Sequence, residues 1–113
     1  MLRRHTGTLA QEKRHHRRVD KDEAQDLLRA ELVRWQERSY SELVERLLDQ
    51  QEVREVIGPS GAWYQLEVQA FWDAQPDGVL RVLGAIDDGR GFRANVPLTD
   101  DFLVAPDGSS VGE

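Results

Sequence analysis

The chain has 113 residues, no cysteine and a formal charge of −6 at pH 7. Its length fits a single domain, and its 39% hydrophobic and 32% charged residues are typical of a globular chain. The absence of cysteine excludes disulfides, thiolate nucleophiles and Cys-based metal sites. No apolar run approaches the roughly 18 residues that span a bilayer, so we expect a cytoplasmic protein without a membrane segment.

Positive charge is concentrated at the N-terminus. Residues 1–18 hold six of the 15 Lys and Arg residues and one of the 21 acidic residues, which leaves nine basic and 20 acidic residues in the rest of the chain. No apolar stretch follows these basic residues, so a secretory signal is not expected. The segment is either a nucleic-acid-binding arm or a disordered extension. We favour the extension, because the acidic domain predicted over 19–113 would repel nucleic acid.

The first predicted element is an amphipathic helix over residues 22–38. Asp20 and Glu23 have the spacing of a capping box at its start, and Glu31 is expected on its polar side. Its apolar residues recur at three- and four-residue steps along one stripe: Ala24, Leu27, Leu28, Leu32 and Trp35. This stripe predicts a helix that packs one face against the rest of the domain.

A second, shorter helix is predicted directly after the first. Ser39 and Glu42 repeat the capping-box spacing. The apolar residues that follow share one face: Tyr40, Leu43, Val44, Leu47 and Leu48. Two such helices need a common apolar partner, and that partner must be a sheet because the remaining sequence has the pattern of strands.

From residue 52 the apolar residues recur with the period of a strand. A short strand is predicted at Val53 to Ile57, closed by the turn sequence Gly58-Pro59-Ser60-Gly61. Within residues 62–73, apolar and polar side chains point to opposite faces: Tyr64, Leu66, Val68, Ala70 and Trp72 to one, and Gln65, Glu67 and Gln69 to the other. Further strands are predicted at 79–87 and 92–98, and a short one at 102–104 before the turn sequence Pro106-Asp107-Gly108.

The strand register follows from keeping the apolar faces together, since a slip of one residue would invert every side chain. Between the second and third strands this condition pairs Trp72 with Leu80, Ala70 with Val82, Val68 with Gly84 and Leu66 with Ile86. Between the third and fourth strands it pairs Ile86 with Phe92, Gly84 with Ala94, Val82 with Val96 and Leu80 with Leu98.

The predicted fold is α+β, with two N-terminal helices packed on one face of a three- to five-stranded antiparallel meander sheet. Gly84 and Ala94 form a small pair in the middle of this sheet. We expect Trp35 to pack over them, because a bulky helix residue fits where the sheet has no large side chain.

Several catalytic classes are excluded by composition. Beyond residue 18 there is no His or Cys, and Lys21 is the sole Lys. Serine and cysteine triads, Schiff-base lysines and His-based zinc sites therefore cannot form in the domain. No phosphate-binding glycine loop is present. We expect a protein that is not an enzyme and needs no cofactor.

Two acidic pairs leave one chemical alternative open: Asp87-Asp88 and Asp100-Asp101. Carboxylates from separate loops can chelate Mg²⁺ or Ca²⁺ or act as an acid–base pair. Both pairs are predicted at strand ends next to turns, where Asp is favoured for local backbone hydrogen bonds. We favour that structural role over a metal or catalytic site.

The outer face of the predicted sheet carries aromatic and basic side chains together. The pairing places Phe71 opposite Arg81, which permits a cation–π contact. Aromatic residues and Arg are enriched in protein interfaces. The candidate binding residues on this face are Trp63, Glu67, Phe71, Arg81 and Arg93. Single-stranded nucleic acid is not expected here, because Glu67 and the acidic domain oppose a phosphate backbone.

Three stretches carry a resemblance: GPSGAWYQLEVQAFWD, VLRVLGAIDDG and LTDDFLVAPDGSSVGE. In these stretches the chain resembles a group of short uncharacterised bacterial proteins. The resemblance extends over the helices but not over the basic tail. It implies a compact domain that stands alone. It carries over no activity and no site residue.

These observations predict a non-catalytic module that binds an unidentified protein partner through its outer sheet face or a strand edge. An acidic immunity or antitoxin protein that neutralises a basic effector is a sharper alternative. A divalent-metal-binding protein or an enzyme that uses the loop aspartates is the second alternative. Nucleic acid is expected only through the basic tail, and a homodimer through an edge strand or a face is compatible with the residues.

Overall fold

A computed structural model describes residues 21–87 and 98–111 of the chain. Its helices lie N-terminal to an antiparallel sheet of five strands, which confirms the predicted α+β class. The N-terminal helix covers residues 21–36 of the described chain. Helix α2 (Tyr40–Leu47) follows after three residues, and the hydroxyl of its N-cap Ser39 accepts a hydrogen bond from the Glu42 N–H at 3.1 Å. The capping role expected of Ser39 is therefore confirmed.

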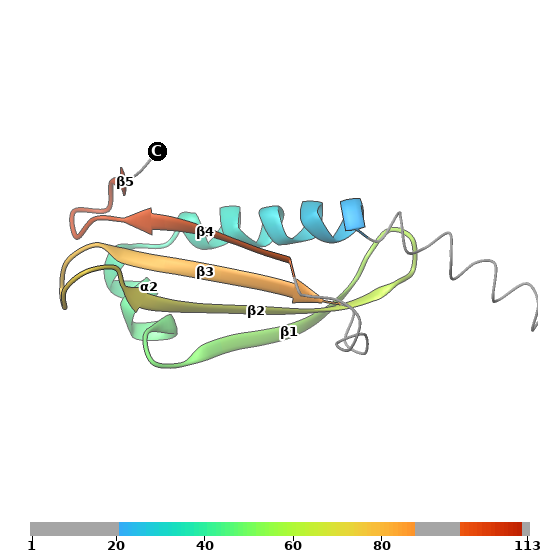
Figure 1. Cartoon of the computed structure of the whole chain (residues 1–113), viewed down its shortest axis with the longest axis horizontal. Helices are drawn as coiled ribbons and strands as arrows, with labels where there is room; N and C mark the ends of the chain where they lie inside the picture. The colour runs from blue at the N-terminus through green and yellow to red at the C-terminus, as the bar shows by residue number, and fades with distance from the viewer. Residues whose placement is uncertain (1–20, 88–97, 112–113) are drawn as a thin grey trace, which may run out of the picture.

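The sheet is a meander in which each strand pairs with the next, in the order β1-β2-β3-β4-β5 (Figure 1). Its strands are β1 (Gln51–Ile57), β2 (Trp63–Trp72), β3 (Leu80–Asp87), β4 (Leu98–Val104) and β5 (Ser110–Val111). The N-terminal helix and α2 pack on one face, which we call the inner face. Because the helices bury only that face, alternate residues of each strand point either into the core or to the opposite, outer face.

The core lies between the helices and the inner face. Its most deeply buried side chains come from all of these elements: Leu28, Leu43, Leu47, Val68, Leu80, Val82 and Ile86. The β2–β3 register pairs Trp72 with Leu80 and Val68 with Gly84, as the alternation predicted. Alternation excludes any odd shift of this register, and the short connection between the predicted strands 62–73 and 79–87 leaves no room for a long even one.

The predicted pairing of β3 with the next strand is wrong. Leu98 lies opposite Ile86 rather than Leu80, and Val104 takes the place opposite Leu80. The two registers differ by six residues, an even number, so both keep the apolar residues on the inner face and the alternation could not separate them. The residues expected to form that strand, 92–97, lie outside the described part of the chain.

The helix residues over Gly84 also differ from the prediction. A Cβ at Gly84 would lie 3.0 Å from a terminal methyl of Leu28 and 3.0 Å from one of Leu32. These two leucines, rather than Trp35, bring the helix onto the centre of β3. Gly84 is required there because the helix approaches the strand too closely for a larger side chain.

The start of the N-terminal helix is tied to the β1–β2 turn through Glu23. Its carboxylate accepts hydrogen bonds from the Ser60 N–H and hydroxyl, both at 2.7 Å, and from the Tyr64 hydroxyl at 2.8 Å. Gly58 is buried directly beneath this carboxylate. Glu23 therefore anchors the turn, whereas its expected capping partner Asp20 lies outside the described residues.

Two further turns close the hairpins. The Tyr40 hydroxyl of α2 donates a 2.6 Å hydrogen bond to the carbonyl of Gly78 in the β2–β3 turn. In the β4–β5 turn the Asp107 carboxylate accepts hydrogen bonds from the Ser109 N–H at 2.9 Å and hydroxyl at 2.7 Å. These bonds hold the pKa of Asp107 below its ordinary value, with the Ser109 hydroxyl as the larger cause. The turn predicted at residues 106–108 is confirmed.

Candidate functional site

The outer face of the sheet presents four of the five predicted binding residues together. Trp63, Glu67 and Phe71 alternate along β2, and Arg81 lies opposite Phe71 on β3. Arg93 lies outside the described residues. The outer face therefore has the composition that the alternation of β2 predicted.

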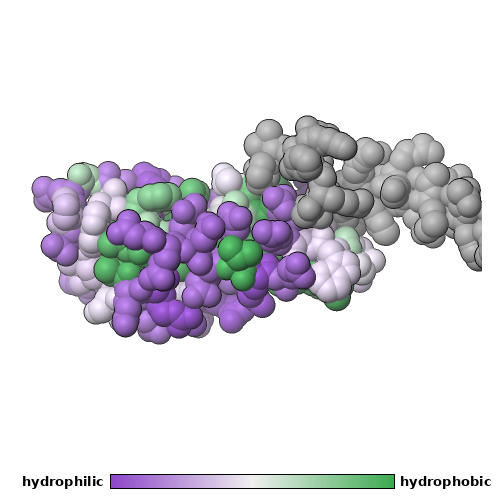
Figure 2. Space-filling model, turned by 90° about the horizontal axis from the view of Figure 1, so that it is seen from below, coloured by the Kyte–Doolittle hydropathy of each residue, from purple (hydrophilic) through white to green (hydrophobic). Residues whose placement is uncertain are grey.

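Exposed apolar side chains mark this face. Ile57 of β1 and Trp63 of β2 are cross-strand partners, with 56% and 57% of their surface exposed. Val53 and Phe71 add exposures of 48% and 42% on the same face. Figure 2 views the molecule from the side of β1 and shows separate apolar patches among hydrophilic side chains. Ile57 and Trp63 make the largest adjacent pair of such residues among those described.

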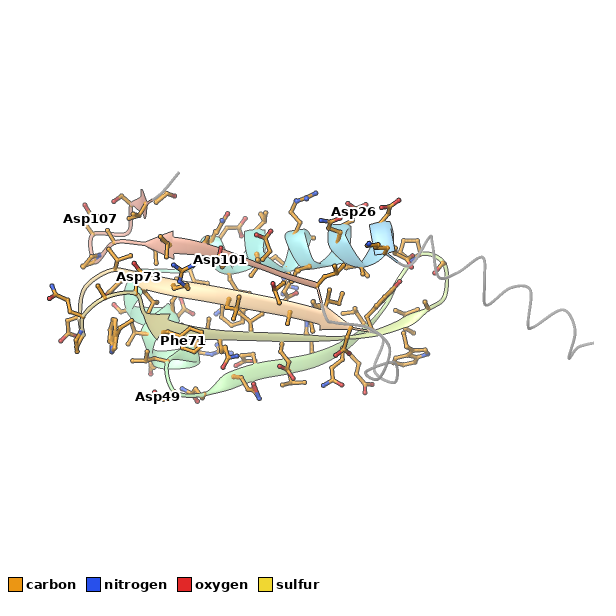
Figure 3. The ribbon with its side chains drawn as sticks, in the orientation of Figure 1. Asp26, Asp49, Phe71, Asp73, Asp101 and Asp107 are labelled. Atoms are coloured by element: carbon orange, nitrogen blue, oxygen red, sulfur yellow. The ribbon has the colours of Figure 1, made fainter. Side chains whose placement is uncertain are left out.

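The contacts of Arg81 differ from the expected cation–π pair. Its guanidinium donates hydrogen bonds to the carboxylates of Asp73, at 2.9 Å, and Asp101. These two bonds, with Asp73 the larger cause, raise the pKa of Arg81 above its ordinary value. Asp73, Asp101 and Phe71 lie near one another on the sheet in Figure 3. Arg81 is therefore part of a carboxylate network rather than a partner of the Phe71 ring.

The predicted position of the Asp100-Asp101 pair at a strand end is wrong. Both residues lie within β4, where Asp100 is opposite Gly84 and Asp101 is opposite Leu83. Successive strand residues point to opposite faces, so these carboxylates diverge, and Asp100 accepts a 2.9 Å hydrogen bond from the Asp101 N–H. Asp88 lies outside the described residues. Among residues 21–87 and 98–111, no three acidic or histidine side chains gather as metal ligands.

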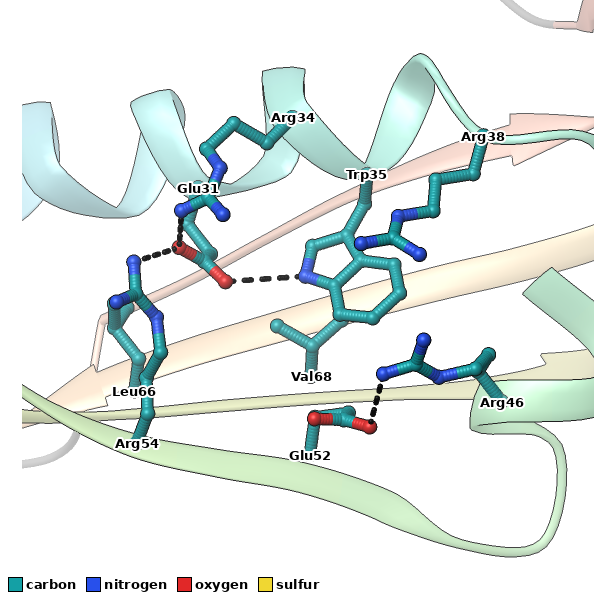
Figure 4. Close-up of a pocket in the computed structure, with 9 residues that line it drawn as sticks. All are labelled: Glu31, Arg34, Trp35, Arg38, Arg46, Glu52, Arg54, Leu66 and Val68. Carbon is teal, nitrogen blue, oxygen red and sulfur yellow. Dashed lines mark hydrogen bonds and ion pairs between the residues drawn. The ribbon is translucent and has the colours of Figure 1, made fainter. Parts of the chain in front are cut away.

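A second candidate site, which the sequence did not predict, is a cleft of about 200 Å³ on the inner side of β1. It opens where the N-terminal helix, α2 and β1 meet, because the helix lies over β2 and β3 and leaves the inner side of β1 uncovered (Figure 4). Its lining contains four arginines, two glutamates and an apolar floor: Arg34, Arg38, Arg46, Arg54, Glu31, Glu52, Trp35, Leu66 and Val68.

Glu31 organises one side of this cleft. Its side chain is 8% exposed, so the expectation that it lies on the polar side of the helix is wrong. The carboxylate accepts a hydrogen bond from the Trp35 indole at 3.1 Å and one from Arg54 at 2.7 Å, and it also lies 3.5 Å from Arg34. A buried carboxylate is stable when it is paired and hydrogen-bonded in this way.

Trp35 lies at the floor of the cleft, close to two guanidinium groups. Arg38 lies 4.7 Å and Arg46 lies 5.9 Å from the ring centroid, within the range of cation–π contacts. Each also reaches a glutamate with one terminal nitrogen: Arg38 contacts Glu42 at 2.7 Å and Arg46 contacts Glu52 at 3.1 Å. Both arginines therefore lie close to the Trp35 ring in the lining of the cleft.

A signal for this cleft was present in the sequence. The inner face of β1 carries Glu52 and Arg54, opposite Val68 and Leu66 of β2. Polar residues at inward positions indicate that no helix covers that part of the sheet. The prediction that the two helices cover the apolar face did not take these inward-facing polar residues into account.

Among the described residues, no helix has both the length and the apolar character that crossing a bilayer requires. Comparison with protein-family models, with curated proteins and with solved structures found no match. The outer face and the cleft are therefore the two candidate sites.

Proposed function

We propose that the chain is a non-catalytic cytoplasmic module that binds a protein partner through the outer face of its sheet. The observation that supports this most strongly is the cross-strand pair Ile57 and Trp63, both more than half exposed. Adjacent large apolar side chains on a solvated face are typical of the centre of a protein interface.

The charges around this pair favour a partner with a basic rim. The described outer face contains five carboxylates, Glu55, Glu67, Asp73, Asp87 and Asp101, and one guanidinium, that of Arg81. Such a face attracts a basic surface over several ångströms and speeds its docking. A basic effector neutralised by an acidic immunity or antitoxin protein would be one partner of this chemistry.

The same charges disfavour a homodimer through this face. Two copies that met face to face would bring their carboxylates together, and like charges brought together in an interface cost several kcal/mol. The surface area of the apolar pair is also small compared with the area that a stable homodimer buries. We therefore assign the outer face to a different protein.

Affinity capture with two matched variants tests this proposal. Trp63→Lys places a positive charge on the outer face, whereas Val33→Lys makes the same kind of change at a 48% exposed residue of the N-terminal helix. We expect a partner that the natural chain and Val33→Lys capture and that Trp63→Lys loses. The purified pair should associate more slowly as salt increases, because screening weakens the attraction. A partner that both variants retain would place the interface elsewhere.

A further inference from the structure

The cleft between the N-terminal helix, α2 and β1 concentrates positive charge in an acidic domain. The described residues include seven Lys or Arg residues. Four of them, Arg34, Arg38, Arg46 and Arg54, line this one cleft against two glutamates. We propose that the cleft binds a phosphate group, with Arg38 and Arg46 as the residues that contact it.

The arginines approach the cleft from four different parts of the chain. Arg34 comes from the N-terminal helix, Arg38 from the link to α2, Arg46 from α2 and Arg54 from β1. Guanidinium groups have five N–H donors in a rigid fork that matches the oxygens of phosphate. Donors that converge from several directions suit an anion with several oxygens and two charges better than a single carboxylate.

The four arginines divide into two pairs with different roles. Arg34 and Arg54 contact Glu31, whose side chain is almost fully buried, and this carboxylate fixes their positions. Arg38 and Arg46 instead contact Glu42 and Glu52, whose side chains are 42% and 43% exposed. Exposed ion pairs contribute little, so a phosphate can replace Glu42 and Glu52 as the partner of these two arginines at small cost.

The floor of the cleft adds little to the recognition of a ligand. Trp35, Leu66 and Val68 lie beside the arginines (Figure 4), but their exposures are only 6%, 2% and 1%. The guanidinium groups are therefore the main contacts that the cleft offers. The part of the ligand that the cleft recognises is the phosphate group, carried either by a free small molecule or by a phosphorylated side chain.

The Trp35 indole N–H provides the readout. It lies inside the cleft, while Trp63 on the outer face and Trp72 give the other two indole signals of the chain. In a nitrogen–proton correlation spectrum of the full chain, phenyl phosphate is expected to shift the Trp35 signal in a saturable way. Inorganic phosphate should shift the same signal. A Trp35 signal that neither compound shifts at millimolar concentration would overturn the proposal.

Arginine substitutions inside and outside the cleft separate binding in the cleft from a general effect of net charge. Arg38→Gln combined with Arg46→Gln should weaken phenyl phosphate binding by roughly tenfold or more, because charge-assisted bonds to phosphate are lost. Arg29→Gln, at an exposed arginine of the N-terminal helix outside the cleft, should leave binding unchanged. Unchanged binding in the double variant would overturn the proposal.

Glu52→Gln tests the proposal through an increase in affinity, which a loss of folding could not produce. It removes the carboxylate that competes for Arg46, so phenyl phosphate should bind several-fold more tightly. Glu55→Gln makes the same change on the outer side of β1 and should have no effect. Equal effects of the two changes would show that only net charge matters and would overturn the proposal.

A phosphorylated peptide distinguishes the two sources of the phosphate group, which are a free small molecule and a phosphorylated protein segment. A phosphotyrosine peptide that binds more tightly than phenyl phosphate at the Trp35 signal would identify a phosphorylated protein segment, and equal or weaker binding would identify a free ligand. Either result supports the phosphate site. Loss of protein capture in Trp63→Lys concerns the outer face and does not bear on this site.

Discussion

The indole N–H of Trp35 donates a 3.1 Å hydrogen bond to the carboxylate of Glu31, one helical turn earlier. The same carboxylate accepts a hydrogen bond from Arg54 of β1. Glu31 thus fixes the Trp35 ring at the floor of the cleft and connects the helix to β1. The structure of the cleft depends on this one buried acid.

Glu31→Ala should destabilise the fold by about 1–3 kcal/mol, because it leaves the buried Trp35 N–H without an acceptor and Arg54 without its counter-charge. Glu31→Gln keeps an acceptor of the same shape and should cost less. Urea unfolding of the two variants measures the difference. Equal free energies of unfolding for Glu31→Ala and the natural chain would contradict this account.

Gly84→Val tests the approach of the helix to the sheet. A Cβ at this position would lie 3.0 Å from both Leu28 and Leu32, so the larger side chain must push the helix outward at a cost of about 1–3 kcal/mol. Ala85→Val, on the outer face of the same strand, is the control and should be tolerated. Thermal unfolding of both proteins gives the comparison. A tolerated Gly84→Val would show that the helix is not held against β3.

Gly58→Ala should act through Glu23. The added Cβ would lie 2.5 Å from the carboxylate carbon of Glu23, which must then leave the Ser60 and Tyr64 donors. We expect a loss of about 1–2 kcal/mol in the free energy of unfolding. In a double-mutant cycle with Glu23→Ala, the two losses should not add, because both remove the same hydrogen bonds. Additive losses would contradict a shared cause.

The β4–β5 turn should show a pH dependence that originates from Asp107. Its folded-state pKa is lowered from 3.8, so its contribution to stability is present above that value and is lost as the pH falls through the lowered pKa. Ser109→Ala removes the hydroxyl donor and should move the pKa of Asp107 up towards 3.8. Carboxyl titration by NMR measures this value. An unchanged pKa in Ser109→Ala would exclude the hydroxyl as the main cause.

The sequence predicted those parts of the fold that repeat with a clear period. With the short connection between residues 73 and 79 as a constraint, alternation in β2 defined its inner face and its register with β3. It could not define the β3–β4 register, because Leu98 and Val104 belong to the same alternate set and both fit opposite Leu80. Only the length of the connection separates these registers, and apolar alternation carries no information about that length.

The two candidate sites also differ in how far the sequence could predict them. The outer face follows from alternation, so Trp63, Glu67, Phe71 and Arg81 were predicted on one side. The cleft was missed because Glu31 was placed by its polarity, although it lies at helical spacing between the buried Leu28 and Trp35. The contact that stabilises its burial comes from Arg54, which is 23 residues away in the chain. A pairing of this range has no periodic signal in the sequence.

The most direct test of the central claim is crosslinking in cells from a photoreactive residue placed at Gln65, beside Trp63 on the outer face, with Gln36 on the exposed side of the helix as the control position. The account predicts a crosslink to a different protein from position 65 and none from position 36. A product from position 36 alone, a crosslink between two copies of the chain, or no product from position 65 would contradict it.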